Sequence, residues 1–240
     1  MKKAGIRSTV DHLVVLAATL EDGIRWCEAL LGVTPQAGGE HPLMGTHNCV
    51  INISSFAFPD CYLEIMALNP GVPTQRAAGL KRWFDMDDVQ LQSQVAQHGP
   101  QLVHFVVRCP DVQAAVDEMT ALGLDCGTLV DATRQTPEGL LQWRLTVRDD
   151  GQRLMGGAVP ALIQWGAADD IEPRHPTRSM PYSDLQLQGL LLNHTLPVLL
   201  ETACESIGLN GMQVQSGLPG ICATLQTPRG LVRLSSPPGH

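Results

Sequence analysis

Several kinds of signal are scarce in this sequence of 240 residues, and each scarcity narrows the functions that it allows. Lysine occurs only three times, and the 16 Lys and Arg residues are outnumbered by 24 Asp and Glu, which gives a net charge of -8. Binding to nucleic acid needs a basic surface that neutralises phosphates, so we expect no nucleic-acid partner. No stretch approaches the ~20 apolar residues that span a bilayer, so we also expect no membrane span.

Cysteine and the common nucleotide-binding motifs give equally little support to other classes of site. The seven cysteines form no CxxC pair, which argues against a zinc cluster built on thiolates. Several lie among apolar residues, so we expect reduced, buried thiols in a cytoplasmic protein. No Gly-rich phosphate loop, Walker motif or nucleophile elbow occurs. Hydrophobic residues make up 44% of the chain, which is typical of a globular protein.

The sequence does contain an internal repeat. His12 lies in a short apolar strand that is followed by an amphipathic helix over 20–31, and His104 lies in a similar strand followed by a helix over 112–122. Each histidine precedes the start of its helix, at Leu20 or Val112, by the same eight positions. The two segments therefore predict two copies of one structural unit.

Strand-like runs follow each helix and complete the unit. They cover 49–54 and 61–67 in the first copy, and 141–147 and 161–165 in the second. We predict an α+β fold in which paired βαβββ modules form a cupped mixed β-sheet. The predicted boundaries are modules at about 8–68 and 100–166, a connection over 69–99, a domain over 1–175, and a C-terminal extension over 176–240.

The C-terminal extension reads as a weaker βαβββ-like half-module. It has a predicted strand over 185–192, a helix over 196–207 and three short strands after it, and Gln188 stands where the other copies have histidine. A half-module cannot complete a cup alone. We therefore expect residues from about 180 onward either to cover the first two modules or to form a homodimer interface. In the connection we expect a short helix over 88–97 and a lid over a pocket.

A metal site is predicted from the repeat. His12 and His104 occupy equivalent strand positions, and Glu64 lies in an apolar strand where a carboxylate is costly unless it is paired or bound to a cation. The matching strand of the second copy carries Gln164. Two imidazoles, a carboxylate and an amide oxygen suit Zn²⁺, Ni²⁺, Mn²⁺ or Fe²⁺. The alternative is an ion pair between Glu64 and an arginine, either Arg108 or Arg144.

These segments resemble the vicinal oxygen chelate superfamily, and more narrowly a bacterial glyoxalase-like domain family. The resemblance covers roughly residues 8–180 and rests on these motifs: Asp11-His12-Leu13-Val14, His41-Pro42, Gly45-Thr46-His47-Asn48, Tyr62-Leu63-Glu64, Trp143-Arg144-Leu145, Ile163-Gln164-Trp165 and His175-Pro176. It implies paired βαβββ modules around a metal, with His12, Glu64 and His104 at three usual ligand positions. Gln164 stands where the family usually has glutamate.

Other polar and aromatic residues in these motifs are candidates for substrate binding. We assign this role to His47, Asn48, Arg144, Trp165 and His175. Arg144 offers a planar fork to a substrate carboxylate, and its alternative is a solvated strand residue. The alternative for Asn48 is a turn residue, for Trp165 a residue of the core or the pocket wall, and for His175 a residue of the domain junction.

The function predicted from these features is a glyoxalase-like, metal-dependent lyase or isomerase that acts on a small oxygen-bearing metabolite. The metal would polarise adjacent substrate oxygens, and Glu64 would be the catalytic residue that moves the proton. One alternative is an Fe(II) dioxygenase of the extradiol type that uses His12, His104 and Glu64 as a facial triad. The other is a metal-free protein that binds a small ligand.

Overall fold

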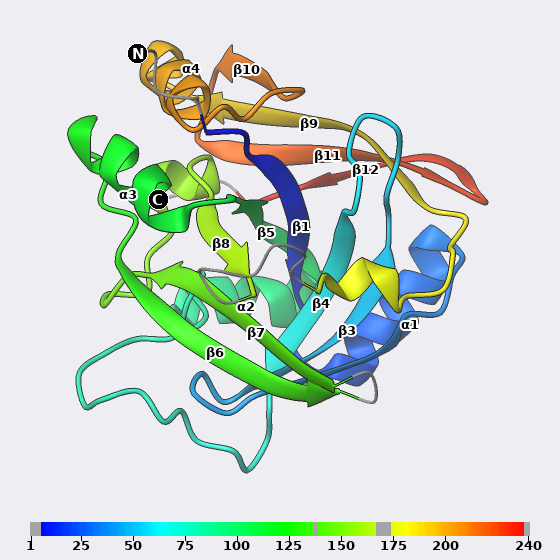
Figure 1. Ribbon diagram of the computed structural model, residues 1–240. Helices are drawn as coiled ribbons and strands as arrows, with labels where there is room; N and C mark the ends of the chain where they lie inside the picture. Colours follow the sequence, from blue (N-terminus) through cyan, green and yellow to red (C-terminus); the bar gives the residue numbers. More distant parts are fainter. Residues whose placement is uncertain (1–5, 137–138, 167–173, 238–240) are drawn as a thin grey trace.

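The two predicted modules form a single curled β-sheet (Figure 1). The computed structural model describes residues 6–136, 139–166 and 174–237. The first module comprises β1 (Thr9–Leu16), α1 (Leu20–Leu31), β2 (Gln36–His41), β3 (Thr46–Asn52) and β4 (Tyr62–Leu68). The second comprises β5 (Gln101–Arg108), α3 (Val112–Ala121), β6 (Thr128–Thr136), β7 (Gly139–Val147) and β8 (Ala161–Trp165). The α+β class and the cupped mixed sheet are confirmed.

The strand order shows that the modules are related by a pseudo-twofold axis. The eight-stranded sheet has the order β2-β3-β4-β1-β5-β8-β7-β6, which reads as the same pattern from either edge toward the β1–β5 pair. In each module the strand before the helix pairs in parallel with the last strand, and β1 pairs with β5 in antiparallel fashion. The two modules are thereby fused at the centre of the sheet.

Helices α1 and α3 form within one residue of their predicted ranges, and a capping side chain marks where each begins. Thr19 accepts a hydrogen bond from the backbone N–H of Asp22 at the start of α1, and Gly32 ends that helix with φ 78°. Asp111 caps the start of α3 in the same manner. These arrangements satisfy backbone groups that a helix leaves free at its ends. In the connection, α2 (Val89–His98) forms close to the predicted range, with Asp88 as its N-cap.

The two faces of the large sheet bury different sets of residues. Along β1, Val14 and Leu16 belong to the apolar cluster on the inner, concave face, whereas Leu13 and Val15 belong to the larger cluster on the outer face. This alternation is the two-residue period of a strand. The connection over 69–99 contributes Trp83 to the inner cluster, so part of the connection plugs the interior of the cup.

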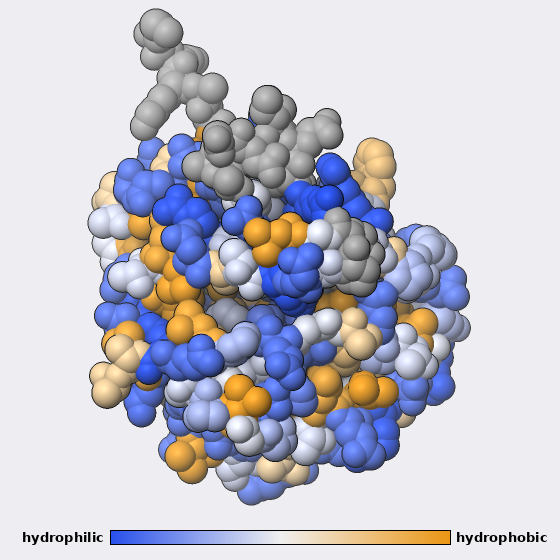
Figure 2. All heavy atoms as spheres, turned by 60° about the horizontal axis from the view of Figure 1, so that its bottom comes forward, coloured by the Kyte–Doolittle hydropathy of each residue, from blue (hydrophilic) through white to orange (hydrophobic). Residues whose placement is uncertain are grey.

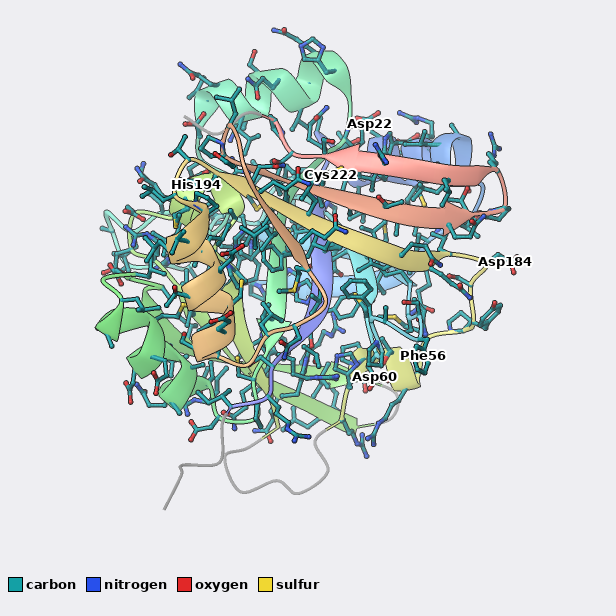
Figure 3. All side chains as sticks on the ribbon, turned by 90° about the horizontal axis from the view of Figure 1, so that it is seen from above. Asp22, Phe56, Asp60, Asp184, His194 and Cys222 are labelled. Carbon is teal, nitrogen blue, oxygen red and sulfur yellow. The ribbon has the colours of Figure 1, made fainter. Side chains whose placement is uncertain are left out.

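The C-terminal extension covers the outer face of the sheet (Figure 3). It consists of β9 (Gln186–His194), α4 (Pro197–Ser206), β10 (Gln213–Ser216), β11 (Gly220–Thr227) and β12 (Gly230–Ser235). Its sheet has the order β10-β9-β11-β12, with β9 and β10 paired directly in parallel. The predicted sequence of elements is present, but the strand pairing differs from that of the two modules. Within the described ranges, no helix is long and apolar enough to cross a bilayer.

We expect the C-terminal sheet to contribute strongly to the free energy of unfolding. Leu187 on β9 is fully buried in the outer cluster, whereas Leu231 on β12 is 69% exposed. Leu187→Ala should lower the free energy of unfolding by about 2–5 kcal/mol because it leaves a cavity in the core. Leu231→Ala should change it by less than about 0.5 kcal/mol. Urea denaturation measures the free energy of unfolding of both variants. Similar small changes in the two variants would show that the extension is not part of the common core.

Candidate active site inside the curled sheet

A narrow cavity of about 50 Å³ lies inside the curled sheet. Four residues selected from the sequence line it, namely His12, Glu64, Asn48 and Trp165. Apolar side chains from β4, β7, β8 and the connection form most of its remaining wall. A concave, largely apolar cavity with a few convergent polar groups is typical of a small-molecule site.

The carboxylate of Glu64 is the centre of the polar groups in this cavity. Glu64 is only 5% exposed. Its Oε2 lies 3.5 Å from Nε2 of His12, and its Oε1 lies 3.8 Å from Nε2 of His41. The side-chain amide of Asn48 donates a hydrogen bond to Oε1. Hydrogen bonding and nearby imidazoles make the burial of this carboxylate tolerable. Neither Arg108 nor Arg144 is its partner, since they pair with Asp60 and Asp131.

Asp11 fixes the position of His12. The pairing of β1 with β5 shifts by one residue between Val10 and His12, which leaves Asp11 at a β-bulge. Its carboxylate accepts hydrogen bonds from Nδ1 of His12 at 2.6 Å, Nε1 of Trp165 at 2.9 Å and Nε2 of His175 at 2.9 Å. Bulges often redirect side chains beside active sites. Here the bulge gives His12 a buried partner, so that its other ring nitrogen faces Glu64.

The ionised state of Asp11 follows from these contacts. Burial by itself would raise the pKa of its carboxyl, but the hydrogen bonds and charges of His12 and His175 outweigh burial and hold that pKa well below its usual range. A carboxylate that is ionised only accepts hydrogen bonds. The ring nitrogens of both histidines that face Asp11 are therefore donors, which sets their orientation.

His41 belongs to the His41-Pro42 motif, from which no role was predicted, and it lines the cavity. It lies at the end of β2, beside Trp83, with the two rings 5.2 Å apart and nearly perpendicular. Burial lowers the pKa of His41, so this imidazole is neutral near pH 7. The motif signal was present in the sequence, but only the curling of β2 toward β4 brings His41 to Glu64.

His104 faces the concave side but is shut off from the cavity. The ring of Phe84 lies 4.9 Å from its ring, and its Nε2 accepts a hydrogen bond from the backbone N–H of Ala161 at 3.1 Å. His104 lines a separate pocket of about 30 Å³. Burial, with the nearby charge of Arg153 as a smaller cause, lowers the pKa of His104 to about 3. The prediction that His104 meets His12 and Glu64 at one site does not fit this arrangement.

Three further predicted residues lie on the face of the sheet that is turned away from the cavity. Gln164 accepts a hydrogen bond from the backbone N–H of Val112 at the start of α3. His47 and Arg144 flank residues that line the cavity, Asn48 and Trp143, so strand alternation directs them to the opposite face. The assignments of metal binding to Gln164 and substrate binding to His47 and Arg144 are not supported by these positions.

Strand register explains why the second module lacks a counterpart of Glu64. Val14 is opposite Glu64 in the first module, and the equivalent residue Val106 is opposite Ala161 in the second. A methyl group cannot bind a metal. Only His12 and Glu64 of the four predicted ligands share the cavity, and the described residues contain no group of three or more His, Cys, Asp or Glu side chains arranged to hold a metal ion. The predicted four-residue metal site does not fit this arrangement.

His175, the remaining predicted residue, lies beside the cavity and not in it. It is buried and reaches the site through Asp11. The segment that follows it contributes Pro176 and Met180 to the wall of the cavity. The hydrogen bond between His175 and Asp11 therefore anchors this segment across the opening.

Comparison with known proteins identifies the family and the fold. Residues 10–206 match the sequence profile of the family described as "Glyoxalase-like domain". A hypothetical protein from Staphylococcus aureus superposes with a TM-score of 0.55 at 13% identity, over 95% of this chain and 88% of that one. Methylmalonyl-CoA epimerase from Mycobacterium tuberculosis gives a TM-score of 0.39 at 16% identity, over 69% and 91%. No curated protein matches the sequence. The Staphylococcus aureus structure shares the overall fold with this chain.

The buried His104 predicts a measurable loss of stability in acid. Its folded pKa of about 3 lies below the value near 6.5 of a free histidine. Between these two values the unfolded chain binds a proton that the folded chain does not, so the free energy of unfolding falls as the pH falls. In His104→Gln, the free energy of unfolding should therefore decrease less steeply below pH 6, by up to about 1.4 kcal/mol less per pH unit.

Urea denaturation at pH 7.5 and at pH 5 tests this prediction. Histidine at an exposed position provides the control, and His98 at the end of α2 is suitable. His98→Gln should leave the pH dependence of the wild type unchanged. If His104→Gln retains the full acid slope, His104 is not the buried neutral group that causes it.

Proposed function

The chain belongs to the glyoxalase-like domain family, and we propose that it is an enzyme that moves a proton at a carbon next to a carbonyl group of a small oxygen-bearing metabolite. The observation that carries this proposal is the buried Glu64 carboxylate, which faces a narrow cavity between two imidazoles. The reaction is of the isomerase or lyase type. Family membership supports the class of site, and the residues of the cavity support the chemistry.

Glu64 is the proposed base. A carboxylate that is fixed within reach of the reacting carbon can act as a general base. The Asn48 amide holds one oxygen in place, and the Gly39 backbone N–H in turn donates to Oδ1 of Asn48 at 2.6 Å. The other oxygen is directed to the cavity beside His12. This arrangement keeps the base fixed before a substrate binds, which is what efficient proton transfer requires.

The two imidazoles have different proposed roles. His12 donates its Nδ1 proton to Asp11, which leaves Nε2 as an acceptor in the cavity, where it is proposed to take a proton from a substrate hydroxyl group. His41 lies on the other side of Glu64 and is kept neutral by burial. It is proposed to receive or return a proton by way of Glu64. Both roles use only side chains that line the cavity.

The two metal-dependent functions considered from the sequence need a different arrangement. Both rely on His104, whose Nε2 is engaged with the backbone of Ala161 and whose ring lies against Phe84 and outside the cavity of His12 and Glu64. A lyase with four ligands also needs Gln164, which lies on the opposite face of β8. The second candidate function is a metal-free protein that binds a small ligand, which the positions of His104 and Gln164 outside the cavity favour.

Solvent exchange tests the proposed base without knowledge of the natural substrate. Wild-type protein in D₂O should catalyse loss of the proton signal next to the carbonyl in at least one of 2-oxobutanoate, acetoin or pentane-2,3-dione, followed by ¹H NMR. Glu64→Gln should lower the exchange rate by about 10²–10⁴-fold, the usual contribution of a positioned base. Glu205→Gln, an exposed substitution on α4, should leave it unchanged.

Binding of these compounds without any exchange would favour the ligand-binding protein over the enzyme. Equal exchange rates in the wild type and Glu64→Gln would contradict the role of Glu64. Thermal denaturation of each variant shows whether a loss of exchange comes from unfolding.

Chelation separates the proposed chemistry from metal-dependent chemistry. We expect exchange to persist after treatment with EDTA, because the predicted ligands do not meet in one place. Elemental analysis before and after treatment is the measurement. Near-stoichiometric Zn, Ni, Mn or Fe that is lost together with activity, and is absent from His12→Ala, would overturn the metal-free mechanism.

A further inference from the structure

A wide groove opens at the mouth of the active-site cavity and gathers positive charge. It has a volume of about 830 Å³ and shares with the cavity Val50, Arg134, Leu141, Pro176 and Met180. Its lining includes Arg134, Arg174 and Arg178, whereas Glu40 is the acidic residue among those that line it in the described part of the chain. In a chain with 16 basic and 24 acidic residues, this local excess of arginine runs against the overall charge. On the face drawn in Figure 2, hydrophobic residues lie in separate small groups between hydrophilic ones.

Arg134 has a central place in this groove because it lines both the groove and the narrow cavity. It lies on β6, at one edge of the curled sheet, and reaches across to β2 at the other edge. A Cβ atom on Gly39 would lie 2.1 Å from Nη1 of Arg134. The guanidinium therefore occupies space that is available only because β2 has glycine there.

The surroundings of Arg134 leave its charge available to a ligand. Its charge acts on both His41 and Tyr62, which line the cavity with Glu64. Arg134 is half-buried, and no carboxylate among the described residues forms a recorded ion pair with it. Glu40, the acid of the groove, is exposed and accepts a hydrogen bond from Asn69. A partly desolvated guanidinium that faces a cavity is stabilised when an anion binds there.

We propose that Arg134 binds the anionic end, a carboxylate or phosphoryl group, of a substrate whose carbonyl end lies against Glu64. This inference rests on the proposed function, because it names the class of substrate that the same cavity takes. Arg178 also lines the groove but not the narrow cavity, and its charge attracts an anion toward Arg134. The planar fork of arginine suits both carboxylate and phosphoryl oxygens, and this makes Arg134 a residue that determines specificity.

Equilibrium binding tests the inference without any turnover. The probes are 2-oxobutanoate, its uncharged counterpart pentane-2,3-dione, and inorganic phosphate, measured by calorimetry and by the fluorescence of the tryptophans that line the cavity. We expect 2-oxobutanoate or phosphate to bind the wild type at least about tenfold more tightly than the dione, because only the anions form a charge-assisted hydrogen bond with Arg134. Preference between the two anions identifies the carboxylate or the phosphoryl group as the better match.

Variants of two arginines on neighbouring strands provide the matched comparison. Arg134→Gln should weaken anion binding about tenfold or more, and Arg134→Lys should restore part of the loss. Arg144→Gln is the control, because Arg144 pairs with Asp131 on the opposite face of the sheet. Equal effects of Arg134→Gln and Arg144→Gln, or no binding of either anion to the wild type, would overturn the inference.

Glu64→Gln separates this inference from the proposed function. It should lower the rate of proton exchange by about 10²–10⁴-fold, and it should not weaken anion binding, because it removes a negative charge from the cavity. Anion binding that depends on Arg134 in a protein without exchange activity would refute the enzyme and leave the anion site intact. Suppose instead that exchange is lost in Glu64→Gln but unchanged in Arg134→Gln, with charged and uncharged probes alike. This result would refute the anion site and leave the proposed enzyme intact.

Discussion

The antiparallel pairing of β1 with β5 is the constraint on which the rest of the structure depends. It joins two modules that would each expose an unpaired strand edge, and it places the strands that carry His12 and His104 at the centre of one sheet. Once this pair forms, alternation along each strand decides which residues face the cavity and which face the C-terminal sheet. The curl of the sheet then brings its two edge strands, β2 and β6, close enough for Arg134 to reach Gly39.

The irregularity in that pairing is as important as the pairing itself. Asp11 lies at the bulge and is wholly buried, which would be unfavourable for a lone carboxylate. Three donors from β1, β8 and the segment after β8 satisfy it. One buried charge thus links the orientation of His12 to the placement of the segment that closes the cavity. A change in the orientation of His12 should therefore change the position of this segment, and movement of the segment should change the orientation of His12.

The plug formed by Trp83 and Phe84 divides the interior of the cup into two environments. On one side Glu64, His12 and His41 share a cavity, and on the other His104 lines a separate pocket together with Arg148 and Arg153. The two rings of the plug stack at 5.3 Å, and Phe84 has a left-handed φ of 58°. A residue other than glycine adopts that conformation only when its surroundings hold it there. The separation of the two histidines is therefore a property of the connection between the modules and not of the modules themselves.

Much of the architecture could be predicted from local patterns. The repeated strand and helix signals locate both modules, and the cost of a carboxylate in an apolar strand selects Glu64 as a residue of the site. Local patterns do not determine strand register. Five apolar or amide residues in β8 do not reveal which of them lies opposite Val106, so Gln164 was matched to Glu64 although Ala161 holds that position. The same limit applied to His47 and Arg144, because a shift of one residue moves a side chain to the other face.

The sequence by itself determined the order of the elements, the apolar core, and the presence of a carboxylate and histidines in strands that would be buried. These features depend on local propensity and on two-residue or 3.6-residue periods. Only the tertiary structure decided that His41 lies beside Glu64, that Phe84 lies against the ring of His104, and that Arg134 lines both the cavity and the groove. Those contacts join residues far apart in the chain through strand register, a bulge and the closure of the sheet, and no local pattern encodes them.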